Sequence, residues 1–443
     1  MGALSRELVI EPTPFGARAG LLEGGRLIGV SIADADAFPA RGQIFFGRVR
    51  VVDHDLDAAF VDCGLGEDGY LSARDARVLS GQARGAPIGR QLHEGQAVLV
   101  QVRRDPQGGK GPRLTADLAL AGPCLVFRPR QAGLGLSERR AARGATAAEL
   151  SAEAERLRHL WQTIEAKAGD ARAPARLHGE TEPVQWLLGE HLGDGPDRIL
   201  LADQAALVRA RGYLAEWRPS LLDRLEHLDA FAASGAGEQL AAALEPVVEL
   251  AGGGRLIIQA TAALTAIDVD GAGRRPLEVD IEAAAEVARQ LRLRRLGGTI
   301  VVDFVDLAAK GDRARLLATL RAALADDPAP VRVWPTSPLG LVELSRKRSG
   351  PSLAEQLGRS CPCCAGSGLL PGLRGRSEEL MRDLAGRPPA RVSAAVAPDL
   401  HAYLTGAAAT AWKSFAERQG RAPALRADAA LAPGGYRIQE VAQ

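Results

Sequence analysis

The chain has 443 residues, of which 46% are hydrophobic and 25% charged, and its formal net charge is +1. This length predicts several domains, and no apolar run approaches the roughly 18 residues that a membrane-spanning helix needs. A net charge near zero excludes a global field that attracts nucleic acid, so any such surface must be a local patch.

The cysteines and the N-terminal residues indicate the compartment. Five cysteines, three of them between Cys361 and Cys364, do not resemble a disulfide framework. The segment MGALSRELVIEP lacks the apolar core of a signal peptide. We therefore expect a soluble cytoplasmic protein with no membrane partner.

The first 122 residues favour strands. RELVIEP and RLIGVSIAD are strand-like runs on either side of the turn LEGG. Short strands with glycine-bearing turns then follow closely: QIFFGRVRVV, DAAFVDCG, GYLS, QAVLVQVRR and RLTADLAL. Five such strands predict a small barrel, such as an OB fold.

Three side chains of this barrel can contact nucleic acid. Phe60 and Tyr70 fall in strands where aromatic rings stack on unpaired bases, and Lys110, in the loop QGGKGPR, can reach a phosphate. The residues alone leave another interpretation open, in which Phe60 belongs to the core and Lys110 is a solvated loop charge. We expect Cys63 and Cys124 to be buried small side chains, not ligands.

The next segment mixes strands and helices. CLVFRPR predicts a strand, LGLSERRAAR follows it, and AAELSAEAERLRHLWQTIEAKA predicts a helix. Five arginines precede that helix, either on a solvated face or at a phosphate site: Arg128, Arg130, Arg139, Arg140 and Arg143. TEPVQWLLGEHL and RPSLLDRLEHLDAFAA then predict helices, with the strand DRILLAD between them.

The stretch from Arg255 to Leu307 carries the clearest chemical signal. RLIIQATAALTAIDVD predicts one strand ending in Asp268 and Asp270, DIEAAAEVARQLRLRRLGG predicts a helix stopped by its two glycines, and TIVVDFVDL predicts a strand reaching Asp303. Because a β-α-β crossover makes its two strands parallel, we expect Asp268 and Asp303 side by side at the carboxyl edge of a sheet.

Paired carboxylates at a sheet edge suit Mg²⁺, which is held by one or two carboxylates together with waters and substrate phosphate. The pattern alone leaves open that both aspartates simply end strands in solvated turns. Downstream, DRARLLATLRAALADD predicts a helix, APVRVWP predicts a strand, and LGLVELSRKR ends in Arg346, Lys347 and Arg348. This basic run either flanks a nucleic-acid path or is an ordinary charged surface.

Cys361 and Cys364 form a CxxC pair in the glycine-bounded loop CPCCAGSG. A structural Zn²⁺ needs four ligands, and the chain has no second CxxC and no His near the loop. The pair is thus either a redox motif or half of a site that a second copy completes, and the Gly-rich surroundings argue against redox. A helix from Glu378, the strand RVSAAVAP, the helix DLHAYLTGAAATAWKSFAERQG and the strand YRIQEV then make a small terminal region.

The segments LTAIDVD, EVARQLRLRRLGGTIVVDFVDL, LGLVELSRKR and CPCCAGSG resemble the bacterial ribonuclease E/G family in order and spacing, over nearly all of the chain. The resemblance implies a ribonuclease G-like member with the catalytic domain only. Its fold class would be multi-domain α/β with an inserted OB-fold β-barrel, RNase H-like and DNase I-like subdomains, a zinc-link loop and a small C-terminal α/β domain. The implied boundaries are 1–35 and 181–243 for the two RNase H-like parts, 36–122 for the OB-fold RNA-binding domain, 123–180 for a reduced 5′-sensor-like region, 244–358 for the DNase I-like catalytic domain, 359–369 for the zinc-link and 370–443 for the small dimerisation domain.

The resemblance also implies an activity. A Mg²⁺-dependent endoribonuclease would cleave single-stranded RNA in RNA processing and decay, leaving 5′-monophosphate and 3′-hydroxyl ends. Asp268 and Asp303 match the family's Mg²⁺ ligands, and Asp270, where the family commonly has Asn, matches a residue that helps to orient the ion. The matches to the RNA channel are Phe60, Tyr70 and Lys110. One alternative is a non-catalytic RNA-binding protein on the same scaffold; a redox-regulated metal-binding structural protein is another.

The remaining matches concern assembly and 5′ ends. Cys361 and Cys364 match zinc ligands that each of two subunits contributes, which implies a homodimer through a shared Zn²⁺ and leaves a homotetramer open. Cys363 is extra and could compete for the metal or oxidise. The Arg-Thr strand that binds a 5′-monophosphate in the family is not found between Ser137 and Leu157, so we expect a reduced sensor. The long disordered scaffold of some members is also not found, so we expect no degradosome platform.

Overall fold

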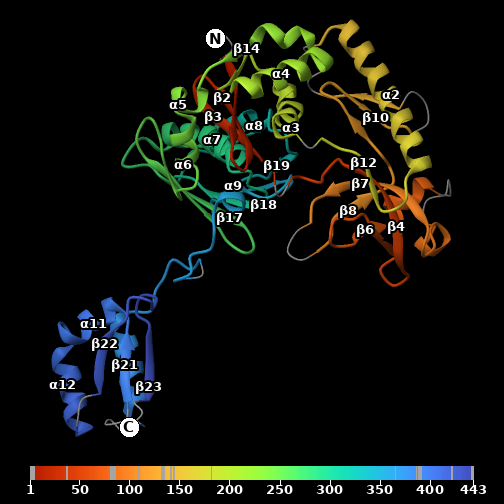
Figure 1. Cartoon of the computed structure of the whole chain (residues 1–443). Helices are drawn as coiled ribbons and strands as arrows, with labels where there is room; N and C mark the ends of the chain where they lie inside the picture. The colour runs from red at the N-terminus through yellow and green to blue at the C-terminus, as the bar shows by residue number, and fades with distance from the viewer. Residues whose placement is uncertain are drawn as a thin grey trace. The chain divides into compact units, whose positions relative to one another are not determined.

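The structure is a computed structural model that describes all residues except 1–4, 36–37, 80–85, 107–109, 131–134, 140–141, 143–144, 181, 365, 386, 388–391, 421–422 and 441–443. It divides into two compact units, Met1–Leu357 and Gly358–Gln443 (Figure 1). Every helix within the described residues is too short or too polar to span a bilayer.

The first sheet has five strands, which come from two distant parts of the sequence. Its order is β14-β13-β1-β2-β3, and β1 runs parallel to β13 with Val9 opposite Leu200. The strands are β1 (Arg6–Thr13), β2 (Gly16–Glu23), β3 (Arg26–Asp34), β13 (Arg198–Leu201) and β14 (Leu225–His227). The helices are α3 (Pro183–His191), α4 (Gln204–Trp217), α5 (Ala230–Ala233) and α6 (Ala236–Ala242), with 3-10 turns η4 (Leu192–Asp194) and η5 (Pro219–Arg224).

Two sequence expectations for this sheet are incomplete or wrong. The strand β2 was not expected, because GARAGLLE opens with small residues and carries no clear alternation. The single helix expected over 218–233 is wrong: η5, β14 and α5 occupy that segment. There β14 pairs with β13, and this tertiary pairing overrides the local helical pattern.

The second sheet closes into a barrel, as the sequence predicts. Its order is β12-β4-β5-β6-β8-β7, and β4 also pairs with β7. The elements are β4 (Ile44–Asp53), β5 (Ala58–Asp62), β6 (Gly69–Ser72), α1 (Ala73–Ala76), η1 (Arg77–Leu79), η2 (Ile88–Arg90), β7 (Ala97–Arg104), β8 (Arg113–Thr115) and β12 (Ala175–His178). The five-stranded OB-like barrel is therefore confirmed, and β12 adds a strand to the β4 side that was not expected. Cys63 is buried in its core, as expected.

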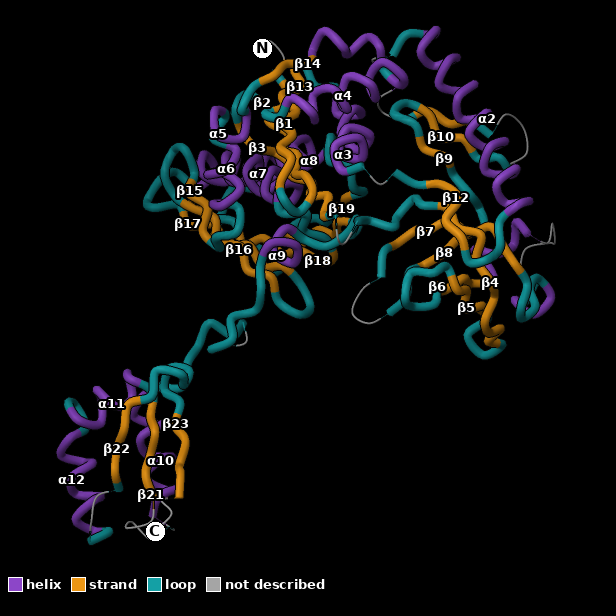
Figure 2. The backbone as a smooth tube through the Cα atoms, in the orientation of Figure 1, coloured by secondary structure: helices purple, strands orange, loops and turns teal. Residues whose placement is uncertain are grey.

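A small sheet packs beside the longest helix (Figure 2). It contains β9 (Leu120–Ala121), β10 (Leu125–Phe127) and β11 (Leu136–Glu138), and the helix is α2 (Ala147–Asp170). Thr146 and Glu149 form a capping box that begins the helix. The buried Glu153 of α2 accepts the backbone N–H groups of Cys124 and Leu125 at 2.9 and 2.8 Å, which ties α2 to β10.

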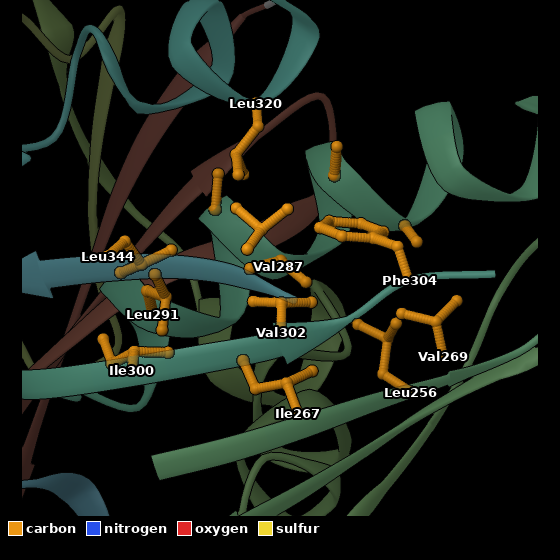
Figure 3. Close-up of a cluster of buried hydrophobic side chains, with 14 of the residues drawn as sticks. Leu256, Ile267, Val269, Val287, Leu291, Ile300, Val302, Phe304, Leu320 and Leu344 are labelled. Carbon is orange, nitrogen blue, oxygen red and sulfur yellow. The ribbon is translucent and has the colours of Figure 1, made fainter. Parts of the chain in front are cut away.

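The third sheet has the order β15-β16-β17-β18-β20-β19. Its elements are β15 (Val247–Glu249), β16 (Arg255–Ala260), β17 (Thr265–Asp270), α7 (Pro276–Leu293), β18 (Gly298–Asp303), α8 (Lys310–Leu324), β19 (Val331–Val333), β20 (Val342–Arg346) and α9 (Leu353–Leu357). One face is apolar and packs on α7 and α8: Figure 3 shows Ile267, Val302 and Leu344 of the strands meeting Val287 and Leu320 of the helices. The opposite face carries the exposed side chains.

Two expectations here are corrected. The run from Arg255 to Asp270 is not one strand but a hairpin, in which β16 and β17 pair antiparallel. Its turn is closed by Thr261, whose hydroxyl donates to the carbonyl of Leu264 at 2.8 Å. The helix also ends earlier than its glycines suggested, since Arg295 already has a left-handed φ of 54°.

The second unit is a three-stranded sheet of order β22-β21-β23 with three helices. Its elements are α10 (Leu373–Ala385), β21 (Val392–Val396), α11 (Pro398–Thr405), α12 (Ala409–Arg418), β22 (Ala424–Ala427) and β23 (Tyr436–Glu440). The single helix expected over 399–420 is wrong, because Gly406 ends α11 with φ −113° and ψ −99° and a second helix follows. The strand β22 was also not expected.

Candidate functional site

Two aspartates lie side by side on the exposed face of the third sheet. The parallel pairing of β17 and β18 places Asp268 opposite Asp303 in register, as the β-α-β reasoning predicts. Both side chains are exposed, whereas their neighbours Ile267, Val269 and Val302 point into the core. Since adjacent strands are about 4.8 Å apart, the two carboxylates share one small patch of the sheet.

Asp270 lies on the same face but is held by its own hairpin. Arg255 is directly opposite it in the β16–β17 register, and their side chains form an ion pair at 3.0 Å. The Asp270 Oδ1 also accepts the backbone N–H of Ala272 at 3.0 Å. These contacts, first the Ala272 N–H and then the Arg255 charge, lower the pKa of Asp270. Asp270 is therefore an oriented, ionised carboxylate whose charge Arg255 balances.

A buried carboxylate fixes the chain just after Asp303. Asp280 of α7 is fully buried, and its Oδ1 accepts the backbone N–H of Val305 at 3.0 Å. Burial raises the pKa of Asp280 to about 6. Because this bond links α7 to the residues that follow β18, it helps to set the direction of the chain just after Asp303.

The aspartate pair suits a hard divalent cation. Among the residues that the structure describes, no three His, Cys, Asp or Glu side chains converge as a metal-binding group. Two carboxylates nevertheless suffice for Mg²⁺ when waters and substrate phosphate complete its octahedron. Asp268 and Asp303 offer oxygen ligands and open access, so the residues present fit that ion.

The barrel carries an aromatic and basic row across its outer face, called the barrel row below. Strand pairing places its members successively opposite one another on β4, β5, β6, β8 and β7: Val51, Phe60, Tyr70, Arg113 and Arg104. The Phe60 and Tyr70 rings pack edge to face with centroids 6.0 Å apart, and the Arg113 guanidinium lies 5.3 Å from the Tyr70 centroid. Phe60 and Tyr70 are half-buried, so each presents ring surface to solvent.

The core interpretation of Phe60 is therefore not supported, because Phe60 faces outward beside the exposed Val51. Lys110 is exposed, two residues before Pro112, whose carbonyl accepts the backbone N–H of Tyr70 at 2.8 Å. The structure thus places Phe60 beside Tyr70, and Lys110 close in sequence to the segment that pairs with Tyr70. Sequence reasoning missed Arg113 and Arg104, because only strand pairing reveals that they continue the aromatic pair.

The arginines before α2 have partners within the chain. Arg128 pairs with Asp117 at 3.6 Å, Arg130 donates to the Ala116 carbonyl at 2.9 Å and Arg139 donates to the Gly122 carbonyl at 2.6 Å. Arg140 and Arg143 lie outside the described residues. The idea of a phosphate site here stays a prediction.

The basic run after β20 needs a correction. Arg346 neither flanks a nucleic-acid path nor lies on the surface: it is buried, pairs with Asp327 at 2.9 Å and donates to the Leu296 carbonyl. Its alternation within β20 points it to the buried face, whereas Lys347 and Arg348, just beyond the strand, are exposed.

The cysteine loop lies in the second unit. Cys361 and Cys363 are exposed and Cys364 is half-buried. Backbone N–H groups of Cys364 and then Cys363 lower the pKa of the Cys361 thiol, which favours the thiolate that binds metal. The zinc site stays a prediction, since two thiols supply only half of the four ligands that a structural Zn²⁺ needs. Cys124, in contrast, is fully buried, as expected, and its sulfur accepts a hydrogen bond from Arg218 at 3.1 Å.

Comparison with known proteins identifies the class as ribonucleases. The model of the ribonuclease E/G family matches residues 124–349. Ribonuclease G of Escherichia coli (strain K12) is 32% identical over 428 residues, covering 86% of this chain and 88% of that protein. Ribonuclease E of Nostoc sp. (strain PCC 7120) is 34% identical over 396 residues, covering 79% of this chain and 57% of that protein. The chain belongs to the ribonuclease E/G family.

The alignment lengths also show that this chain is shorter inside the matched region. Since 86% of 443 residues is about 381, the 428 aligned positions with ribonuclease G include about 47 that face gaps in this chain. The comparison with the Nostoc ribonuclease E, in which 79% of this chain is matched over 396 positions, shows a similar shortfall.

Proposed function

We propose that this chain is a Mg²⁺-dependent endoribonuclease that cleaves single-stranded RNA in RNA processing and decay in the cytoplasm, leaving 5′-monophosphate and 3′-hydroxyl ends. Membership of the ribonuclease E/G family carries the endoribonuclease activity itself. The observation that supports the metal requirement is the register of Asp268 with Asp303 on an exposed sheet face.

The chemistry divides between the ion and the protein. When bound, Mg²⁺ polarises the scissile phosphate, activates a water and balances transition-state charge. Asp268 and Asp303 would hold the ion with carboxylate oxygens. Asp270 would help to orient the ion or the attacking water, since Arg255 and the Ala272 N–H keep its carboxylate ionised and directed. Asp280 would keep the end of β18 in place through Val305.

RNA binding would be the task of the barrel row. Bases stack on Phe60 and Tyr70, since aromatic stacking is tolerant of sequence and suits unpaired strands. Arg113, Arg104 and Lys110 would pair with backbone phosphates, giving a local positive patch on a chain of net charge +1. A local patch of this kind would attract RNA even though the chain as a whole is nearly neutral.

A cleavage assay tests the activity. A 5′-labelled unstructured RNA is incubated with the protein in Mg²⁺, in Ca²⁺ and in EDTA, beside Asp303→Asn. We expect cuts in Mg²⁺ only, and products whose new 5′ ends are open to a monophosphate-dependent exonuclease. RNA binding without cleavage in any divalent cation would instead favour a non-catalytic RNA-binding protein.

We further propose that Zn²⁺ links two chains. Cys361 and Cys364 supply two thiolates, and a two-fold contact supplies the same pair again. His401, the nearest His in sequence, lies in α11 beyond the loop. We thus expect half a Zn²⁺ per chain and a homodimer, which in turn can pair into a homotetramer.

Metal analysis and mass photometry on one sample test the zinc link. The double variant Cys361→Ser with Cys364→Ser should lose zinc and shift toward monomer, whereas Cys363→Ser, the matched control in the same loop, should keep both. One Zn²⁺ per monomeric chain would rule out the shared site.

A further inference from the structure

An aromatic side chain lies on the same sheet face as the aspartate pair, at the edge of the sheet that β19 forms. Trp334 follows β19 and is 39% exposed, a large value for tryptophan. The Arg332 guanidinium lies 5.9 Å from its ring centroid. Arg332 is itself exposed, so the two side chains form an aromatic and cationic surface at the edge of the sheet, called the Trp334 platform below.

Strand register places this platform on the side of the sheet that carries Asp303. The Trp334 backbone N–H donates to the Glu343 carbonyl at 3.0 Å, and Glu343 is paired with Val301 of β18. Val301 is two residues before Asp303 and so shares its face. Two strand spacings and two residues along the strand separate the positions by about 12 Å. This separation suits a neighbouring nucleotide, not the scissile phosphate.

We propose that Trp334, supported by Arg332, stacks on an unpaired base of the RNA next to the cleaved bond, and so helps to determine where the enzyme cuts. The inference rests on the proposed function, and extends it from the barrel row to a second stacking site. An exposed indole offers a large face for a base, and an arginine beside it adds a cation–π contribution.

The charges around the platform favour a base over a phosphate. Glu343 lies between Trp334 and β18 on the same face and is exposed, and Asp268 and Asp303 lie beyond it. These carboxylates repel a phosphate, whereas a neutral base on the indole meets no such penalty. RNA is also favoured over a protein partner, because a protein covering this face would screen the aspartates from the substrate.

The test pairs single abasic nucleotides in the RNA with substitutions of Trp334. Wild type, Trp334→Phe and Trp334→Ala cleave a set of RNAs with one abasic site at each position around the cut. For wild type, an abasic site at one position near the cut should raise KM about five- to 150-fold, the usual worth of a stack. Trp334→Ala should already have this raised KM on intact RNA, with a kcat within about two-fold of that of wild type. An abasic site at the same position should then raise the KM of the variant no further. Trp334→Phe should restore most of the binding.

Three outcomes would overturn the platform. Equal sensitivity of wild type and Trp334→Ala at every abasic position would show that no base contacts the indole. A change of oligomeric state in Trp334→Ala would show that a second copy covers it. An equal rise of KM in Val208→Ala, an exposed apolar side chain on α4, would show a non-specific effect. Circular dichroism checks the fold of each variant.

A separate measurement distinguishes failure of the Trp334 platform from failure of the proposed function. If wild type cuts no RNA, RNA-induced quenching of tryptophan fluorescence still compares wild type with Trp334→Phe. Quenching that is lost in Trp334→Phe supports the platform without catalysis, and quenching that is unchanged overturns it.

Discussion

The aspartate pair and the barrel row are built in opposite ways. Asp268 lies two residues before the end of β17 and Asp303 ends β18, and because one helix joins these parallel strands, one β-α-β unit brings the two aspartates together. The barrel row draws its side chains from five strands of a closed sheet, between Val51 and Arg113. The pair is small and acidic, and the row is broad, aromatic and basic.

Because of this difference, the two regions affect different free energies, that of the transition state and that of RNA binding. A carboxylate pair that holds an ion acts on the transition state and contributes little to the hold on RNA. A row of rings and guanidinium groups holds substrate and transition state alike, so its loss raises KM with kcat unchanged. Substitutions in the two regions should therefore be distinguishable by steady-state kinetics.

The largest effect is expected at the pair. Asp268→Asn and Asp303→Asn should each lower kcat by about 100-fold or more, because each removes a ligand charge whose ion supplies several kcal/mol to the transition state. RNA binding, measured by fluorescence anisotropy, should stay near that of wild type. Cleavage at the wild-type rate by either variant would show that the pair is not the metal site.

The aspartate pair was predictable from the sequence because its position depends only on elements that follow one another along the chain. Strand, helix and strand follow one another between Thr265 and Asp303, and the crossover rule then fixes the register. The five barrel strands were predictable for a similar reason, since each is a short apolar run between glycine turns. Both regions needed only the order of elements along the chain.

What sequence reasoning missed depends on contacts across strands. Arg113 beside Tyr70, Arg255 beside Asp270 and Arg332 beside Trp334 are far apart in sequence or lie at strand ends without a motif. Arg346 was misplaced because a run of basic residues gives no sign of which one turns inward to Asp327. Tertiary pairing decided each case.

The next largest effect is expected in the barrel row. Phe60→Ala should weaken RNA binding by about 1–3 kcal/mol, the usual worth of a base–aromatic stack, and leave kcat nearly unchanged. Val51→Ala is the matched control, since Val51 is its exposed neighbour across β4 but offers no ring. Circular dichroism must show that the variant is folded. An unfolded Phe60→Ala would return the residue to the barrel core, and a fall in kcat alone would place it with the catalytic groups.

A smaller effect is expected when the cation that balances the charge of Asp270 is removed. Arg255→Gln should leave the Asp270 carboxylate without its cationic partner, so the site becomes more negative and binds Mg²⁺ more tightly. The Mg²⁺ concentration for half-maximal cleavage should fall by about two- to five-fold, in keeping with the modest worth of an exposed ion pair. Arg255→Lys, which keeps the charge, should stay close to wild type. A rise in the KM for RNA with no change in Mg²⁺ dependence would assign Arg255 to the substrate.

The smallest effect is expected at the 5′ end of the RNA, because the Arg-Thr strand that the family resemblance calls for is not found in this sequence. Otherwise identical substrates with a 5′-monophosphate or a 5′-hydroxyl should be cleaved at rates within about five-fold, the upper worth of an exposed charge pair. The reason is that the described arginines before α2 are already engaged: Arg128 by Asp117, Arg130 by the Ala116 carbonyl and Arg139 by the Gly122 carbonyl. A phosphate must compete with these partners to gain a contact. A much larger stimulation that disappears in Arg128→Gln or Arg139→Gln would show that these side chains exchange their partners for a 5′-phosphate and that the chain reads 5′ ends without the Arg-Thr strand.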